Sequence, residues 1–243
     1  MTDESLRQTD YFLLGNELGR DIHEAIVGKY GADSPFVTRG IFYDEKSGLV
    51  KGSKPGYVVA ANEFLKGDGM RTVNSYDLQK LIENREPDTR GFLEDLGLVL
   101  YSATGKNEYL ARDIIGQIKE RNGKVDFPTR LNLNELELET DNNAPQGLAF
   151  RLTDKTQIVV AQELAQEYPL KKFSKLDQRG IPIFENEGKH TFYAGPPANS
   201  GLHVLIRDRD SDLCTWYWDL VDSDASGRVL VCREAARLDK IES

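Results

Sequence analysis

The spacing of apolar residues predicts a helical first half and a strand-rich last third. Apolar side chains at helical spacing predict a helix over residues 6–29, and Gly31 is a residue type that ends helices. The same reasoning predicts helices over residues 75–84, 108–121 and 156–166. Most of the helix content is therefore expected before residue 170.

Strands are predicted wherever the apolar period falls to two. Phe36–Tyr43 alternates before a polar turn, and two short apolar runs, Tyr57–Ala60 and Gly97–Tyr101, are expected to be buried strands. Five more short strands separated by turn residues are expected over residues 181–185, 190–194, 202–207, 213–220 and 228–233. Helices early and antiparallel strands late indicate an α+β fold.

Residues 127–143 carry neither period and are expected to be irregular. The segment 123–144 is therefore the best candidate for a boundary between structural units. The sequence contains no low-complexity linker and no internal repeat that would mark another one.

Composition excludes several classes of protein. The 243 residues are 39% apolar and 29% charged, which is typical of a globular chain long enough to bury one sizeable core. A net charge of −9 argues against a nucleic-acid backbone or an anionic membrane as the main partner. No apolar run approaches the length of a membrane span, and no signal-peptide pattern opens the sequence.

The two cysteines, Cys214 and Cys232, are too few for a disulfide scaffold or a four-cysteine zinc site. They fall on neighbouring predicted strands and could pair, although two unpaired strand cysteines are the simpler interpretation. The three histidines show no ligand spacing with one another or with the cysteines, so we expect neither a metal nor a cofactor.

Two segments resemble ligand loops without completing the pattern. Thr104-Gly105-Lys106 lies at a strand-to-helix turn, but Leu100 and Asn107 stand where a phosphate loop needs a small residue and a hydroxyl. Asp222–Gly227 has the alternating acids of a calcium loop, but Arg233 holds its twelfth position and cannot coordinate a cation. A helix start and a polar β-turn are the favoured interpretations.

The segment Gly201–Cys232 lacks residue types that are common elsewhere in the chain. Of the first 200 residues, 39 are Lys, Glu or Gln, yet these 32 residues contain none, and no Met or Asn. A solvated hairpin would use Lys and Glu freely, so physical chemistry alone does not explain the gap. A genetic filter does: randomising the adenines of Asn codons that end in a pyrimidine cannot yield Lys, Glu, Gln, Met or Trp.

The segment resembles the variable region of diversity-generating retroelement proteins, most closely those of archaea and archaeal viruses. The resemblance rests on the positions of Trp216, Trp218, Leu220 and the stretch Gly227–Val231. The resemblance implies a C-type-lectin-like fold with antiparallel C-terminal strands and a helical N-terminal part. It divides the chain into an N-terminal elaboration, residues 1–95, and a ligand-binding domain, residues 96–243, with the variable region at 201–232.

Strand geometry assigns roles within this region. Trp216 and Trp218 share one strand face as scaffold, whereas Thr215, Tyr217 and Asp219 share the other, expected to face solvent. The residues expected to contact a ligand are His203, Asp208, Asp210, Ser211, Asp212, Cys214, Tyr217, Asp219, Asp222, Asp224 and Ser226.

The resemblance implies a receptor-recognition protein rather than an enzyme, carried on a viral tail-fibre tip or outside a cell. Its partner would be a host or target cell-surface protein or glycan, with no nucleic acid and no membrane insertion. Two alternatives stay open at this point. One is an intracellular enzyme or regulator with a site near Gly97–Lys106, lined by Ser102, Thr104 and Lys106, and the other is a structural virion protein with no ligand.

Overall fold

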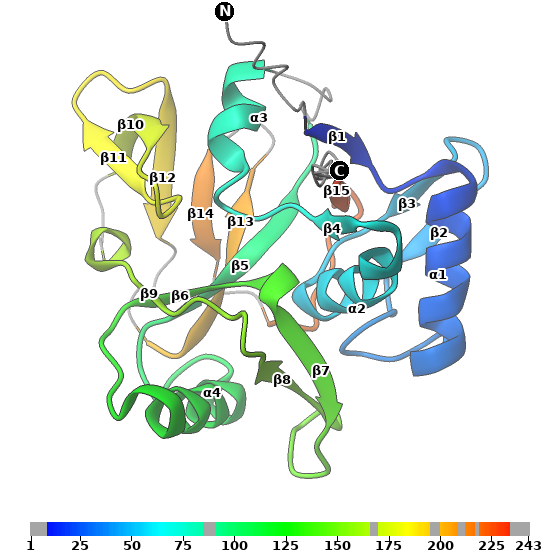
Figure 1. Cartoon of the computed structure of the whole chain (residues 1–243), viewed down its shortest axis with the longest axis horizontal. Helices are drawn as coiled ribbons and strands as arrows, with labels where there is room; N and C mark the ends of the chain where they lie inside the picture. Colours follow the sequence, from blue (N-terminus) through cyan, green and yellow to red (C-terminus); the bar gives the residue numbers. More distant parts are fainter. Residues whose placement is uncertain are drawn as a thin grey trace, which may run out of the picture.

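A curled eight-stranded sheet runs through the centre of the protein (Figure 1). The computed structural model describes residues 9–84, 91–165, 170–194, 200–208, 212–216 and 219–233. Neighbouring strands of this sheet are antiparallel except β12 and β14, which are parallel. In spatial order the strands are β11 (Pro182–Glu185), β10 (Lys171–Leu176), β12 (His190–Ala194), β14 (Leu213–Trp216), β13 (Leu202–Arg207), β5 (Glu94–Leu100), β6 (Thr129–Asn132) and β9 (Val159–Val160).

A three-stranded sheet joins the two ends of the described chain. Strand β15 (Leu230–Arg233) lies between β1 (Asp10–Leu13) and β4 (Met70–Thr72), antiparallel to both. The expected division after residue 95 falls inside β5, and β15 pairs with two strands from the other side of that division. Two hairpins complete the strands, β2 (Phe42–Asp44) with β3 (Leu49–Lys51) and β7 (Leu136–Thr140) with β8 (Leu148–Leu152).

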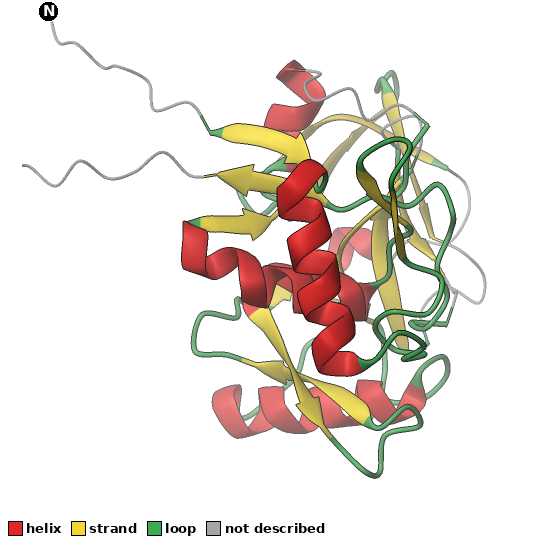
Figure 2. Cartoon of the chain, turned by 90° about the vertical axis from the view of Figure 1, so that its right-hand side faces the viewer, coloured by secondary structure: helices red, strands yellow, loops and turns green. Residues whose placement is uncertain are grey.

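Four α-helices lie in the described part of the chain, α1 (Asn16–Tyr30), α2 (Pro55–Leu65), α3 (Leu78–Asn84) and α4 (Glu108–Asn122). Figure 2 shows α1 in front of α2, beside the three-stranded sheet. Three short 3₁₀ helices cover Lys66–Asp68, Leu133–Glu135 and Gln162–Leu164. No helix within these described ranges is long and apolar enough to span a membrane. The mixed α+β fold class is confirmed.

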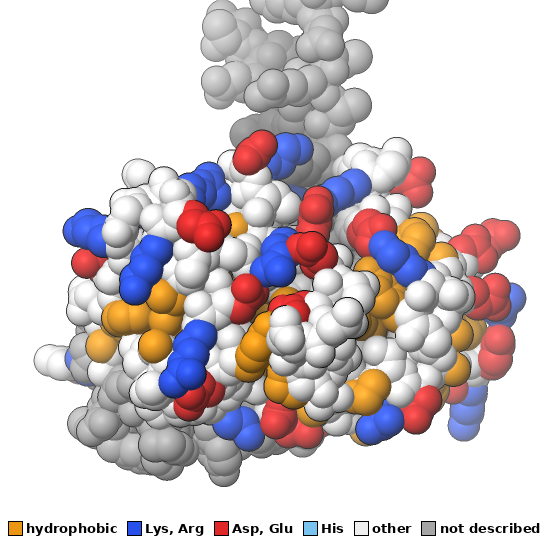
Figure 3. Space-filling view, turned by 90° about the horizontal axis from the view of Figure 1, so that it is seen from below, with side chains coloured by type: hydrophobic (Ala, Val, Ile, Leu, Met, Phe, Trp, Pro, Cys, Tyr) orange, Lys and Arg blue, Asp and Glu red, His pale blue; other side chains and the backbone are white. Residues whose placement is uncertain are grey.

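Strands β5 and β13 of the central sheet are buried on both faces, which explains why they are mostly apolar. On β5, Leu98 and Leu100 pack with Ile114 and Ile118 of α4 in one core cluster. The intervening Val99 points to the other face, where a second cluster gathers Phe173, Phe192 and Leu205 among others. Apolar side chains that reach the surface lie in separate patches between charged ones on the face drawn in Figure 3.

Several expected elements are wrong. Tyr57–Ala60, expected as a strand, lies inside α2, whose residues are buried on nearly every side, so the segment carries no amphipathic signal. Residues 156–166 do not form an α-helix; their described part contains β9 and a 3₁₀ turn.

Three boundaries also differ from expectation. The helix expected over residues 6–29 begins at Asn16, because Asp10–Leu13 pairs with β15 instead. Of Phe36–Tyr43 only Phe42 and Tyr43 are in a strand, and the segment 127–143 forms β6, a 3₁₀ turn and β7 rather than irregular chain. The predictions of β5, α4 and the short strands β11, β12, β13 and β15 are confirmed to within a few residues.

Candidate ligand-binding surface

Three of the predicted ligand residues surround one concavity. Asp219, Asp222 and Asp224 lie in the loop between β14 and β15, and they line a hollow of about 340 Å³, its open mouth included. Asp95 of β5 and Ser53 lie in the same hollow, whose apolar lining comes from Pro55, Leu93, Val204 and Ile206. The structure thus brings these three acids together with residues from outside the variable region.

The rest of the protein holds this loop by its main chain. The Lys54 ammonium donates to the carbonyl oxygen of Val221 at 2.8 Å and to that of Pro35 at 3.0 Å. Main-chain N–H groups donate from Gly52 to the Gly227 carbonyl at 2.9 Å and from Leu93 to the Ser226 carbonyl at 3.3 Å. These bonds need no particular side chain at the loop positions that accept them.

Arg228 continues this pattern from the end of the loop. Its guanidinium donates to the carbonyl oxygens of Ala225 at 3.1 Å and Gly227 at 2.6 Å, and it lies 4.6 Å from the centre of the Phe92 ring. Its own N–H donates to the carbonyl of Leu93 at 2.9 Å. The loop therefore returns to the sheet at a defined point.

Two aspartates also shape the loop from within. The carboxylate of Asp222 accepts the N–H of Asp219 at 3.0 Å, and that of Asp224 accepts the N–H of Ser226 at 2.7 Å and its hydroxyl at 2.6 Å. The Asp224 bond to the N–H two residues later is typical of an Asx turn, and asparagine offers the same acceptor oxygen at either position. Among the described residues, no group of three or more His, Cys, Asp or Glu could hold a metal ion.

Glycine is required where the loop meets the N-terminal half. Gly52 has φ +91°, and a Cβ there would lie 2.6 Å from the carbonyl oxygen of Gly40 and 2.9 Å from the Ser223 hydroxyl. Gly40 itself has φ +79°, and its carbonyl accepts the Ser223 hydroxyl at 3.3 Å. A side chain at position 52 would push the two segments apart.

The floor of the hollow carries opposed charges in a poorly solvated place. Burial raises the pKa of Asp95 to about 6, although the Ser53 hydroxyl donates to its carboxylate and the Lys54 ammonium is near. Burial likewise lowers the pKa of Lys54 to about 8, and the charge of Arg39 adds to this, against the carboxylates of Asp222 and Asp95. Burial therefore disfavours the charged form of both Asp95 and Lys54.

A larger cavity adjoins the hollow through Asp219. It is an open concavity with about 540 Å³ of empty space, open solvent at its mouth included, between the start of α4, the turn before β8 and the beginning of the loop. Asp219 lines both concavities, and the ammonium of Lys106 lies 3.7 Å from its carboxylate. The lining residues are Phe36, Asn107, Glu108, Tyr109, Leu110, Pro145, Gln146, Leu148, Asp219, Leu220 and Val221.

His203 and Cys214 do not lie on this surface, which corrects their assignment as ligand contacts. The His203 ring is 1% exposed, shares a hydrogen bond of 2.9 Å between Nε2 and the Ser200 carbonyl, and packs edge-on against Tyr101. Cys214 is 6% exposed, and burial raises the pKa of its thiol. Both belong to inner strands of the sheet, covered on two faces.

The face of β14 expected to reach solvent is also buried at Thr215. This side chain is 1% exposed and shares a hydrogen bond of 2.9 Å with the Tyr101 hydroxyl. The reason is packing, since the buried Tyr101 side chain lies against this face of β14.

The remaining predicted residues lie around the hairpin between β13 and β14 or outside the described residues. Asp208 is exposed, and its N–H donates to the Asp212 carbonyl at 2.7 Å. The Asp212 carboxylate accepts the N–H of Thr191 at 2.6 Å, and Ser226 is partly buried beside Asp224. Asp210, Ser211, Tyr217 and Trp218 lie outside the described residues, as does the side chain of Trp216.

The residues named for the alternative site near Gly97–Lys106 serve the chain itself. The Ser102 hydroxyl donates to the Thr104 carbonyl at 2.6 Å and accepts the N–H of Gly201 at 2.9 Å. Lys106 reaches toward Asp219 instead of toward a separate pocket.

Sequence reasoning missed Ser53, Lys54 and Asp95. A lysine inside the small-residue stretch Gly52–Gly56 was a signal, because lysine is seldom buried without acceptors to satisfy it. No local pattern marked Asp95.

Comparison of the chain with protein-family models, with curated proteins and with solved structures finds no match.

Proposed function

We propose that this chain is a ligand-recognition protein whose region 201–232 is diversified by a retroelement, on a C-type-lectin-like scaffold. It would act at a viral tail-fibre tip or outside a cell, on a surface protein or glycan. Its contact residues would be Asp208, Asp212, Asp219, Asp222 and Asp224, together with Asp210, Ser211 and Tyr217 from outside the described residues.

The hydrogen bonds to the main chain of the loop carry this proposal. Carbonyl oxygens of residues 221–227, which every residue type possesses, accept hydrogen bonds from Lys54, Gly52, Leu93 and Arg228. A loop held in this way keeps its path while its side chains change. Substitutions at exposed positions usually alter stability by less than about 0.5 kcal/mol, so such a loop tolerates diversification.

The fold proposal has separate support. The variable region supplies the antiparallel strands β13, β14 and most of β15, and helices α1 and α2 belong to the N-terminal part. Pairing of β1 with β15 closes the molecule at its two ends (Figure 1) and anchors the far end of the loop. The segment that lacks Lys, Glu, Gln, Met and Asn, Gly201–Cys232, therefore coincides with strands β13 to β15 and the loop before β15.

Sequencing the DNA that flanks the coding region tests the proposal. We expect a second copy of the segment for residues 201–232, with Asn codons at the positions of Asp219, Asp222 and Asp224, and a reverse transcriptase gene beside it. A flank that contains neither overturns the retroelement assignment, because diversification of this kind requires both.

A further inference from the structure

The hollow and the larger cavity share Asp219 in their linings, and the two together are called the groove below. The groove runs from the start of α4 past Asp219 to Asp95 and Gly227. Much of its lining belongs to residues outside the variable region, such as Tyr109, Leu148, Leu93 and Pro55. A ligand in the groove would touch constant and variable positions together.

Every charged side chain among the described residues that line the groove is acidic. Five carboxyl groups line it, those of Asp95, Glu108, Asp219, Asp222 and Asp224. Of the nearby cations, Lys54 and Arg228 each donate to two main-chain carbonyls, and Arg112 lies 2.5 Å from Glu108. Lys106 is 3.7 Å from Asp219. The protein as a whole has a net charge of −9, these carboxylates included.

The walls between these acids are apolar. Leu110, Leu148 and Leu220 line the larger cavity, and Pro55, Val204 and Ile206 line the hollow. Lysine and arginine suit such a surface, because their hydrocarbon stems cover apolar area while the charged ends reach carboxylates. Anionic ligands are disfavoured by the same carboxylates.

We infer that the groove binds a polypeptide segment of a partner protein in which basic residues alternate with apolar ones. This inference rests on the proposed function and names the partner chemistry for that surface. The basic side chains would lie at Asp219, Asp222 and Asp224, and the apolar ones would enter the larger cavity. Complementary charge of this kind raises the association rate and selects against acidic partners.

A titration with short peptides tests the inference on the full chain. The probe is acetyl-Lys-Leu-Arg-Leu-Lys-amide, compared with acetyl-Gln-Leu-Gln-Leu-Gln-amide and acetyl-Glu-Leu-Glu-Leu-Glu-amide, followed by amide NMR shifts. We expect the basic peptide alone to shift resonances of residues 93–95, 107–110 and 219–227. Its affinity should fall severalfold between about 50 and about 300 mM salt, as screening requires.

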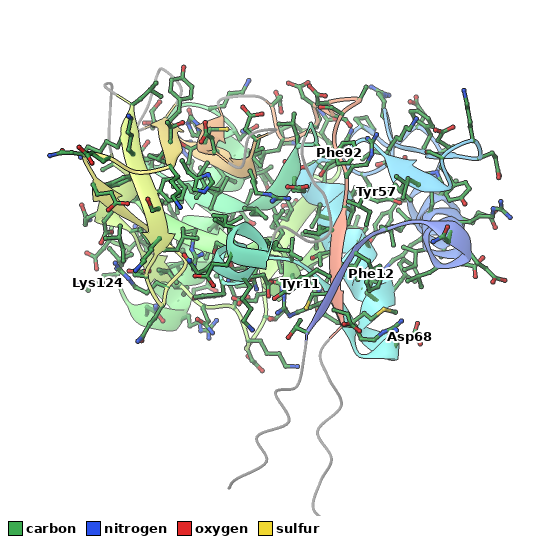
Figure 4. All side chains as sticks on the ribbon, turned by 90° about the horizontal axis from the view of Figure 1, so that it is seen from above. Tyr11, Phe12, Tyr57, Asp68, Phe92 and Lys124 are labelled. Atoms are coloured by element: carbon green, nitrogen blue, oxygen red, sulfur yellow. The ribbon has the colours of Figure 1, made fainter. Side chains whose placement is uncertain are left out.

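Matched variants separate groove charge from net charge. Asp222→Asn with Asp224→Asn keeps both turn acceptors and removes two charges, and we expect affinity for the basic peptide to fall about threefold to tenfold. Asp68→Asn with Asp154→Asn removes two exposed charges elsewhere and should leave affinity within about twofold. Figure 4 shows Asp68 on the opposite side of that view from Phe92, the neighbour of Leu93.

Three results would overturn the inference: no shifts in the groove, equal binding of the neutral peptide, or equal losses from the two double variants. If the flanking repeat is found but the basic peptide does not bind, the peptide inference is overturned and the retroelement assignment stands. Peptide binding without repeats would overturn the retroelement assignment and keep the groove as a basic-segment site.

Discussion

At the scale of single residues, ionisable groups are buried beneath the loop at several points. Glu94 and Arg207 form an ion pair of 2.5 Å between β5 and β13, and their side chains are 2% and 3% exposed. Burial raises the pKa of Glu94 to about 7, against the nearby charge of Arg207. Asp95, one residue on, faces the groove. Buried charges of this kind destabilise a fold unless something else compensates them.

Asp95→Asn should therefore stabilise the protein at neutral pH. The folded pKa of Asp95, about 6, lies above the ordinary value of 3.8, so the folded chain holds this proton more tightly than the unfolded chain. Stability from this group is lost as pH rises from about 4 to about 6 and stays lost above. Asparagine cannot ionise and still accepts from Ser53, so unfolding free energy at pH 7.5 should rise by about 1–2 kcal/mol.

Urea unfolding at several pH values checks this prediction, with Asp154→Asn as an exposed control. The Asp95 variant should lose less stability between pH 4 and pH 6 than the parent, and the control should follow the parent. A variant that is less stable than the parent at pH 7.5 would mean that the fold needs the Asp95 carboxylate itself.

The two cysteines should be unreactive in the folded protein. Cys214 is 6% exposed and Cys232 is fully buried, neither forms a disulfide, and they lie in different sheets. Burial raises the pKa of the Cys214 thiol, which lowers the population of the reactive thiolate. Mass spectrometry after iodoacetamide treatment should find neither residue alkylated natively and both alkylated in denaturant. Rapid native alkylation of Cys214 would instead place it at the surface.

At the scale of elements, the loop between β14 and β15 and the segment 40–54 act as one unit. Residues 52–54 supply the donors that hold the loop, and Gly40 and Gly52 give Ser223 the space it occupies. The segment 40–54 therefore determines the path of the loop. Substitutions in the loop and substitutions in the segment 40–54 should therefore lower the unfolding free energy by different amounts.

Asp222→Asn with Asp224→Asn should change unfolding free energy by less than about 1 kcal/mol, because both side chains keep their acceptor oxygens. Gly52→Ala should cost about 2–4 kcal/mol, because its positive φ and the Gly40 carbonyl at 2.6 Å both oppose a side chain. Thermal unfolding compares them, and Gly28→Ala, at a position with open space around it, is the control. Equal losses from the loop and the glycine variants would make the acids structural.

At the scale of the whole molecule, the chain is tied together across its length. Strand β15 takes partners from residues 10–13 and 70–72, and the last two residues of β13 pair with Asp95 and Glu94 across the expected division. A buried amide network adds to this: Asn62 of α2 donates to the Asn134 carbonyl at 2.8 Å and accepts the N–H of Thr72 at 3.2 Å. The loop between β14 and β15 thus depends on both halves of the chain.

Residues 96–243 expressed alone should not fold. The fragment lacks β1 and β4, which leaves β15 without partners, and it lacks Glu94, which leaves Arg207 buried without its carboxylate. Its amide NMR spectrum should show the narrow dispersion of an unfolded chain, whereas the full chain shows a dispersed one. A dispersed spectrum from the fragment would establish residues 96–243 as an independent domain.

Sequence alone determined the elements whose signals are local. The helix α4 has a clear apolar stripe and a glycine stop, and β5, β12 and β13 are short runs bounded by turn residues. The acidic turn at Asp222–Gly227 was equally readable, because aspartate and glycine form turns with their own neighbours. The composition gap at Gly201–Cys232 is a property of sequence that no structure could reveal.

Tertiary structure decided the rest, since distant partners override local preference. Only packing on both faces of the sheet reveals that Thr215 and Cys214 of β14 are both buried. The apolar run at Tyr57–Ala60 suits a strand or a buried helix equally, and packing selected the helix. Asp95 and Lys54 reach the ligand loop from positions more than a hundred residues away, and no period in the sequence encodes a contact of that separation.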